Sequence, residues 1–194
     1  MPMPSSIAVF CGSKPGNDPV QMETARALGR GMAERGIRLV YGGGRVGLMG
    51  AVADAAQEAG GKVTGVIPEF LMKRELGNDG IDALEVTDSM HSRKQRMFEL
   101  ADAFVTLAGG LGTLDETVEV ITWKQLRLHS KPIVVISVDG HWDFLKDATR
   151  NFTKAGFAYA SDAALFDVVT SVAGAFRALE GTMPGTGGGS EDKL

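Results

Sequence analysis

Cysteine is almost absent from the sequence, because Cys11 is the only one among 194 residues. An intramolecular disulfide is therefore impossible, which favours a reducing compartment. The three histidines, at 91, 129 and 141, lack metal-ligand spacing and no cysteine pair accompanies them, so we expect no metal site. A net charge of −4 gives no basis for non-specific binding to nucleic acid, which we do not expect as a partner.

Long hydrophobic runs are also absent. No apolar stretch approaches the roughly 20 residues that a membrane-spanning helix needs, so no membrane partner is expected. The opening stretch MPMPSSIAVFCGS lacks the basic start of a signal peptide, and its apolar run has the length of a strand. These features predict a cytoplasmic protein. The apolar fraction of 44% is ordinary for a folded domain of this size.

Short apolar runs alternate with longer segments of helical periodicity. The expected strands are 7–11, 38–41, 62–67, 103–107 and 132–138, with a weaker candidate at 165–169. The expected helices are 19–35, 48–59, 90–101, 114–126, 142–155 and 171–179. This alternation predicts one α/β domain over residues 1–180, a Rossmann-like, doubly wound, mostly parallel sheet flanked by helices. The glycine-rich segment 181–194 is expected to be a flexible tail.

Sheets of this kind bind ligands at the carboxyl ends of their strands, and two loops there have the required composition. After the first expected strand, backbone N–H groups and the Ser13 hydroxyl can face a ligand. The alternative is a simple turn with a buried thiol at Cys11, which has no neighbouring histidine to activate it as a nucleophile. After the second strand, YGGGRVGLMG lets the backbone at Gly43 and Gly44 approach a ligand closely.

The same stretch formally satisfies the G-x-G-x-x-G pattern from Gly42 to Gly47. The dinucleotide version of this pattern follows the first strand, whereas here it follows the second. An NAD-dependent dehydrogenase is therefore a weak alternative, and the binding of some other nucleotide is favoured.

Two further segments combine charge with glycine. In DSMHSRKQRMFELAD, the bases Arg93, Lys94 and Arg96 form either a solvated helix face or a phosphate or carboxylate contact. In LAGGLGTLDETVEV, the glycines suit an anion at a helix N-terminus, but no Gly-Lys-Ser/Thr of a Walker A loop follows. Locally, the segment also fits a capping box in which Thr113 caps the helix and Glu116 reaches back to it.

The segments MHSRKQRM at 90–97 and AGGLGTLDE at 108–116 together resemble the paired signatures of the Lonely Guy family. These are cytokinin riboside 5′-monophosphate phosphoribohydrolases, often mislabelled lysine decarboxylases. The family pattern M-H-x-R-K-x-x-M is matched in full, and P-G-G-x-G-T-x-x-E is matched except at Ala108, where the family has proline. Leu111 stands where the family usually has an aromatic residue. Similar motifs cover nearly the whole chain except the tail.

The resemblance implies hydrolysis of the N-glycosidic bond of a nucleoside 5′-monophosphate, either a cytokinin riboside monophosphate or AMP, without a cofactor. It implies Arg93 and Glu116 as the catalytic pair. It also implies a homodimer or a larger assembly with the active site near the subunit interface, and the Trp123 region is our candidate for part of that contact. The implied substrate-binding residues are Glu75, Lys94, Gly110, Leu111, Gly112, Thr113, Leu114, Asp115 and Thr122.

Two other functions stay open at this point. A non-catalytic carrier of a nucleotide or of molybdenum cofactor would use similar glycine-rich loops. A pyridoxal-phosphate decarboxylase would need a Schiff-base lysine, and no lysine stands in a convincing context for that role.

Overall fold

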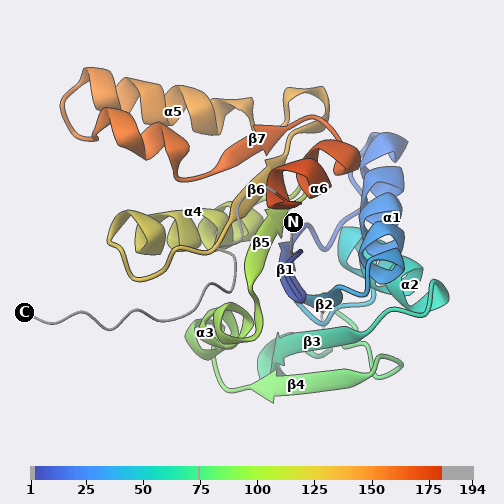
Figure 1. Cartoon of the computed structure of the whole chain (residues 1–194). Helices are drawn as coiled ribbons and strands as arrows, with labels where there is room; N and C mark the ends of the chain where they lie inside the picture. Colours follow the sequence, from blue (N-terminus) through green and yellow to red (C-terminus); the bar gives the residue numbers. More distant parts are fainter. Residues whose placement is uncertain (1–2, 74, 181–194) are drawn as a thin grey trace, which may run out of the picture.

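The computed structural model describes residues 3–73 and 75–180, which form one α/β domain (Figure 1). Its seven strands lie in the order β4-β3-β2-β1-β5-β6-β7, and every neighbouring pair is parallel. The strands are β1 Ser6–Phe10, β2 Arg38–Tyr41, β3 Val63–Pro68, β4 Ala83–Thr87, β5 Ala103–Thr106, β6 Ile133–Ile136 and β7 Asp167–Val169. The helices are α1 Pro19–Glu34, α2 Gly47–Glu58, α3 Met90–Leu100, α4 Leu111–Gln125, α5 Asp143–Lys154 and α6 Val172–Glu180. The predicted doubly wound parallel sheet is confirmed.

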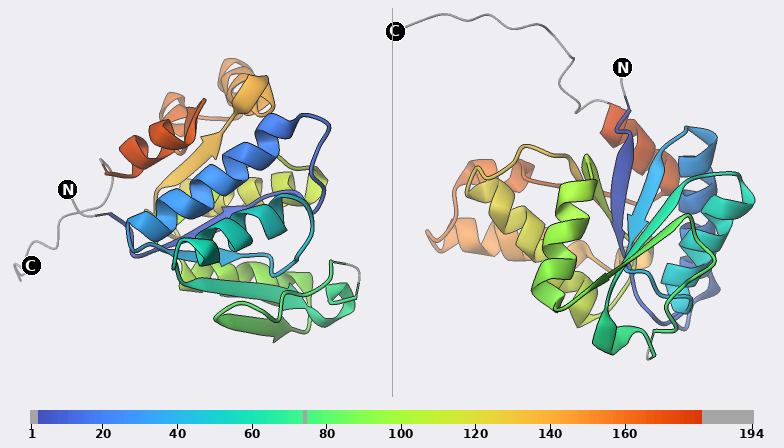
Figure 2. Two further views of the ribbon diagram at one scale, coloured as in Figure 1. Left: turned by 90° about the vertical axis from the view of Figure 1, so that its right-hand side faces the viewer. Right: turned by 90° about the horizontal axis from the view of Figure 1, so that it is seen from below.

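The sheet lies between two layers of helices. Figure 2 shows α1, α2 and α6 on one face and α3, α4 and α5 on the other. Alternate residues of β1 serve the two layers: Ile7 and Val9 pack in one hydrophobic cluster, and Ala8 and Phe10 in the other. All four are almost fully buried, which explains why this strand has a continuous apolar sequence instead of an alternating one.

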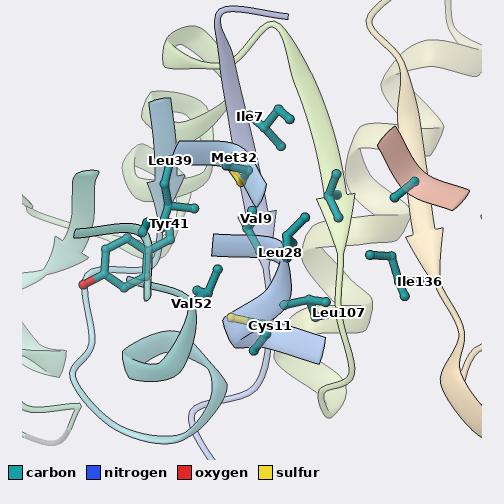
Figure 3. Close-up of a cluster of buried hydrophobic side chains, with 14 of the residues drawn as sticks. Ile7, Val9, Cys11, Leu28, Met32, Leu39, Tyr41, Val52, Leu107 and Ile136 are labelled. Carbon is teal, nitrogen blue, oxygen red and sulfur yellow. The ribbon is translucent and has the colours of Figure 1, made fainter. Parts of the chain in front are cut away.

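The first cluster fills the space between the sheet and helices α1 and α2. Leu28 and Met32 of α1 and Val52 of α2 pack against Leu39 and the neighbouring strands (Figure 3). Cys11 lies at the lower end of this cluster in the view, at the point where β1 ends. The core therefore extends up to the strand ends, where it supports the loops described below.

The structure differs from the sequence-based expectation in two elements. Strand β4 was not predicted, because it is a half-exposed edge strand with no continuous apolar run. Helix α4 begins at Leu111, not at Leu114, because Gly110 is its N-cap residue and Gly112 lies within its first turn. No helix in residues 3–73 and 75–180 is long and apolar enough to cross a membrane. The predicted tail, 181–194, lies outside the described residues.

The strand order fixes where a ligand can bind. From β1 the chain runs outward through β2 and β3 to β4, and it then returns to place β5 on the other side of β1. The loops that follow β1 and β5 therefore diverge to opposite faces of the sheet. A crevice between such loops is the usual ligand site of this architecture.

Candidate active site

A cavity of about 690 Å³ lies at this divergence, beyond the carboxyl ends of β1 and β5. The loop after β1 and the glycine loop after β5 form much of its wall, and α3, α4 and the segment after β3 complete it. The structure brings together in this lining seven of the predicted site residues, Ser13, Glu75, Arg93, Gly110, Gly112, Thr113 and Glu116.

Arg93 is a buried cation with a defined position. Helix α3 begins after Ser89, whose hydroxyl accepts a hydrogen bond from the Ser92 amide at 3.1 Å, and this cap sets the first turn that carries Arg93. The Arg93 side chain is 5% exposed, and its Nη2 donates a hydrogen bond to the Gly42 carbonyl at 3.1 Å. Its guanidinium also lies 3.8 Å from the Glu75 carboxylate. Arg93 therefore belongs to the site and not to a solvated helix face.

Two atoms of this ion pair have unused hydrogen-bonding capacity. Within the described residues, Nε of Arg93 and Oε2 of Glu75 are buried and make no hydrogen bond. Buried polar atoms in native proteins nearly always have a partner, because leaving one unsatisfied costs about 1–3 kcal/mol. Both atoms are enclosed by the protein, so this cost belongs to the contact between Arg93 and Glu75 itself.

Glu116 lies on the inner face of α4 and is 8% exposed. Burial raises the pKa of Glu116 to about 7, and the positive charge of Arg93 opposes this rise. The charge of Glu75 adds to it. A carboxyl group with such a pKa can both accept and release a proton near neutral pH.

The glycine loop presents backbone without side chains to the cavity. Gly110 is the N-cap residue of α4, and no side chain caps the helix. A Cβ atom placed on Gly110 or Gly112 would have no heavy atom within 4 Å, so both face open space. The free N–H groups of the first helical turn favour an anion here.

The capping-box alternative is wrong. Because α4 begins at Leu111, Thr113 is its third residue instead of its cap, and Glu116 lies almost one turn too far along the helix to reach back. Thr113 instead packs against Gly109, where an added Cβ would lie 2.1 Å from its hydroxyl oxygen. The Thr113 carbonyl accepts a hydrogen bond from Thr117 at 2.7 Å.

Other predicted binding residues lie outside this cavity. Leu111, Leu114, Asp115 and Thr122 line a separate surface hollow on α4, together with Val118, Glu119 and Trp123. Lys94 of α3 forms ion pairs with two residues of this hollow, Asp115 at 3.0 Å and Glu119 at 3.1 Å. The structure therefore places the predicted residues of α4 on two of its faces.

Gly43 and Gly44 lie behind the cavity wall instead of lining it. Gly43 has a φ of 77°, and an added Cβ would lie 3.0 Å from Ile67. Gly44 pairs with Gly77 in an isolated antiparallel bridge and packs against the backbone of Glu75. These glycines hold the segment that carries Glu75. Backbone packing thus explains Gly43 and Gly44 in the G-x-G-x-x-G stretch without a bound dinucleotide.

Cys11 lines the cavity but is unsuited to nucleophilic catalysis. It is 7% exposed, and burial raises the pKa of its thiol, with the nearby Glu116 charge adding to the effect. The thiol therefore stays protonated at neutral pH. Among residues 3–73 and 75–180, no group of three potential metal-ligating side chains is placed to hold an ion.

Sequence reasoning missed His141, which also lines the cavity. Its Nε2 atom lies 2.9 Å from the Gly109 carbonyl oxygen, across 32 positions of sequence. The only sequence signal was a polar VDGH turn directly after a buried strand, a place where this fold puts ligand contacts.

A family model described as "possible lysine decarboxylase" matches residues 49–179. A cytokinin riboside 5′-monophosphate phosphoribohydrolase of Rhodococcoides fascians is 41% identical over 179 residues, which cover 92% of this chain and 90% of that protein. The chain belongs to the Lonely Guy family.

Plant members of the Lonely Guy family are similarly close. A cytokinin riboside 5′-monophosphate phosphoribohydrolase of Arabidopsis thaliana is 50% identical over 78% of this chain and 70% of its own length. A probable one of Oryza sativa is 49% identical over 72% of this chain, and that match spans only 56% of the rice protein.

Among solved structures, a molybdenum cofactor carrier protein of Chlamydomonas reinhardtii superposes with a TM-score of 0.70 at 28% identity, covering 91% of this chain and 96% of that one. A molybdenum cofactor binding protein of Rippkaea orientalis gives 0.68 at 22% identity over 93% and 98%, which shows the shared fold alone.

Proposed function

We propose that the chain hydrolyses the N-glycosidic bond of a nucleoside 5′-monophosphate, a cytokinin riboside monophosphate or AMP, to free base and ribose 5-phosphate. The observation that carries this proposal is the burial of Arg93 and Glu116 in one cavity beside an uncapped helix N-terminus. The matched hydrolases of the Lonely Guy family support the same reaction.

Glu116 is the residue best suited to the bond-breaking step. Cleavage at C1′ develops positive charge over C1′ and the ring oxygen, as in other glycoside hydrolyses. A buried carboxylate stabilises this charge more strongly than an exposed one, because little water screens it. With a pKa of about 7, Glu116 can also accept a proton from the attacking water.

Arg93 has a different role, because a guanidinium does not lose its proton in proteins. Its hydrogen bond to Gly42 and its contact with Glu75 fix the plane of the guanidinium beside the cavity. We infer that Arg93 orients the nucleotide and polarises the departing base, while Glu75 contacts a donor group of the substrate. The phosphate binds at the N–H groups of Gly110, Gly112 and Thr113, where the helix dipole favours negative charge.

A homodimer formed through α4 is part of the proposal. Leu111 is 84% exposed and Val118 42% exposed, and both line the surface hollow that contains Trp123. Apolar side chains grouped in this way mark an interface more often than scattered ones do. Because Leu111 directly follows Gly110 of the cavity, such an interface lies at the edge of the active site. The single buried thiol fits the cytoplasm as the compartment of the reaction.

Single-turnover hydrolysis of AMP and of an N6-substituted AMP tests the assignment. Glu116→Gln and Arg93→Ala are each expected to lower the rate at least about 10²-fold while the fold is retained. Glu99→Gln on the exposed side of α3 is the matched control and should keep the normal rate. Near-normal turnover by Glu116→Gln would overturn the catalytic role of this carboxyl.

The second candidate is a carrier, favoured by the structural likeness to the Chlamydomonas reinhardtii protein. A carrier binds its phosphorylated ligand without releasing a base, so product formation separates the two functions. The hydrolases of the Lonely Guy family are 41–50% identical to this chain, whereas the carrier is 28% identical.

A further inference from the structure

The turn between β6 and α5 reaches across to the glycine loop. Trp142, 2% exposed, donates a hydrogen bond from Nε1 to the Leu107 carbonyl at 3.0 Å, directly where β5 ends. Its own amide donates to the Ser137 hydroxyl at 3.0 Å. The His141 ring packs edge-on against the Trp142 indole, with ring centres 4.8 Å apart. The contacts of Trp142 therefore fix the turn that carries His141.

His141 contacts both polar groups of Gly109. Its Nε2 lies 2.9 Å from the Gly109 carbonyl oxygen and 3.3 Å from the Gly109 amide nitrogen. When Nε2 carries a proton it donates to the carbonyl, and in the other neutral tautomer it accepts from the amide. Each form of the ring thus keeps a hydrogen bond to the loop.

Holding the Gly109 carbonyl also fixes the direction of the next amide. The peptide unit is planar and trans, so the Gly110 N–H points opposite to the Gly109 carbonyl. Gly110 lines the cavity at the N-cap position of α4, where the proposed phosphate site lies. On its other side, Gly109 packs tightly against Thr113, which leaves the peptide little room to rotate.

The contact between His141 and Gly109 matters because residue 108 is alanine instead of proline. The family motif has proline here, whose ring fixes φ, whereas Ala108 leaves the backbone free to rotate in the unfolded chain and in an open loop. The Ala108 carbonyl accepts a hydrogen bond from the Gly12 amide at 3.0 Å. Among the described residues, no hydrogen bond from the Ala108 amide is found, so a proline would remove none.

We propose that His141 is a positioning residue that fixes the Gly109–Gly110 peptide for phosphate binding and supplies the rigidity that Ala108 lacks. The identity of the anion rests on the proposed function. The role of His141 in positioning the glycine loop rests on the contacts of His141 and Trp142, and it holds whether or not the protein hydrolyses AMP.

Calorimetric binding of ribose 5-phosphate, the phosphorylated product, tests this without any hydrolysis. His141→Ala is expected to weaken its binding about tenfold, as the loss of one well-placed hydrogen bond would. The KM for AMP should rise by a similar factor while kcat changes less. Binding of adenosine, which has no phosphate, should stay unchanged.

Three further variants make the test specific. His141→Gln places an amide nitrogen near the position of Nε2 and should restore most of the affinity. Ala108→Pro should have little effect alone but should recover most of the affinity in the His141→Ala background. Phe144→Ala is the matched control, because Phe144 also packs on Trp142 but lies outside the cavity lining.

Several results would overturn the inference. One is that His141→Ala binds ribose 5-phosphate within about twofold of wild type, and another is that it loses adenosine binding to the same extent. A third is that Ala108→Pro recovers no affinity in the His141→Ala background, although circular dichroism shows the double variant to be folded. The last is that wild type does not bind ribose 5-phosphate. Wild type that binds ribose 5-phosphate but releases no base from AMP would instead overturn the proposed function, and the variants would still test the loop.

Discussion

The guanidinium of Arg93 occupies the space that a side chain on Gly42 would need. A Cβ atom at position 42 would lie 2.0 Å from Nη2 of Arg93, and the carbonyl of Gly42 accepts the hydrogen bond that orients this group. The first glycine after β2 therefore serves the proposed catalytic arginine and not a dinucleotide.

Gly42→Ala should displace the Arg93 guanidinium and lower kcat/KM for AMP about 10²-fold, because a shift of about 1 Å in a reacting group has effects of this size. Steady-state kinetics measure the effect. Gly80→Ala is the control, since a Cβ there meets its nearest neighbour at an ordinary 3.5 Å. Normal kinetics in Gly42→Ala would contradict the role assigned to the Arg93 position.

The raised pKa of Glu116 predicts a dependence of stability on pH. The folded protein keeps a proton on Glu116 up to a pKa of about 7, whereas the unfolded chain releases it near 4.5. This group's contribution to the free energy of unfolding is therefore full below pH 4.5 and is lost as the pH rises to about 7. Relative to Glu116→Gln, wild type should lose on the order of 3 kcal/mol between pH 4 and pH 8.

Urea unfolding of both proteins across this pH range measures the difference. Glu99→Gln controls for the loss of a carboxylate elsewhere. A stability difference between wild type and Glu116→Gln that does not change with pH would show that the Glu116 carboxyl is not perturbed.

If the dimer forms through the apolar surface of α4, charged substitutions on that surface should disrupt it. Leu111→Asp and Val118→Asp place charges in the hollow that contains Trp123, and each should convert a dimer to monomers in sedimentation-velocity experiments. Phe157→Asp changes an 87% exposed residue beyond α5 and should leave the dimer intact. A wild-type monomer, or dimers that survive both substitutions, would contradict the interface.

Much of the fold was predictable because most strands of this sheet are buried on both faces. Their continuous apolar runs identified β1, β2, β3, β5 and β6, and the alternation with helices identified the topology class. Strand β4 was not predicted, because an exposed edge strand has no such apolar run. The catalytic roles proposed for Arg93 and Glu116 come from the paired motifs and not from local chemistry, since each residue alone also fitted a structural role.

Other features of the site depend on tertiary contacts that local patterns do not encode. His141 meets Gly109 across 32 positions, so neither segment alone predicts the contact. The predicted binding residues of α4 separate because successive helical positions point to different faces, which places Glu116 in the cavity and Asp115 on the outer hollow. The start of α4 shifted by about one turn because Gly112 adopts helical backbone in the first turn, which its low helix propensity argues against.

Release of products from AMP tests the central claim most directly. Wild-type protein incubated with AMP, followed by chromatographic separation, should yield adenine and ribose 5-phosphate in equal amounts, with no products from Glu116→Gln on the same timescale. Recovery of intact AMP bound to wild-type protein, with no free base, would contradict hydrolysis and leave the carrier function in its place.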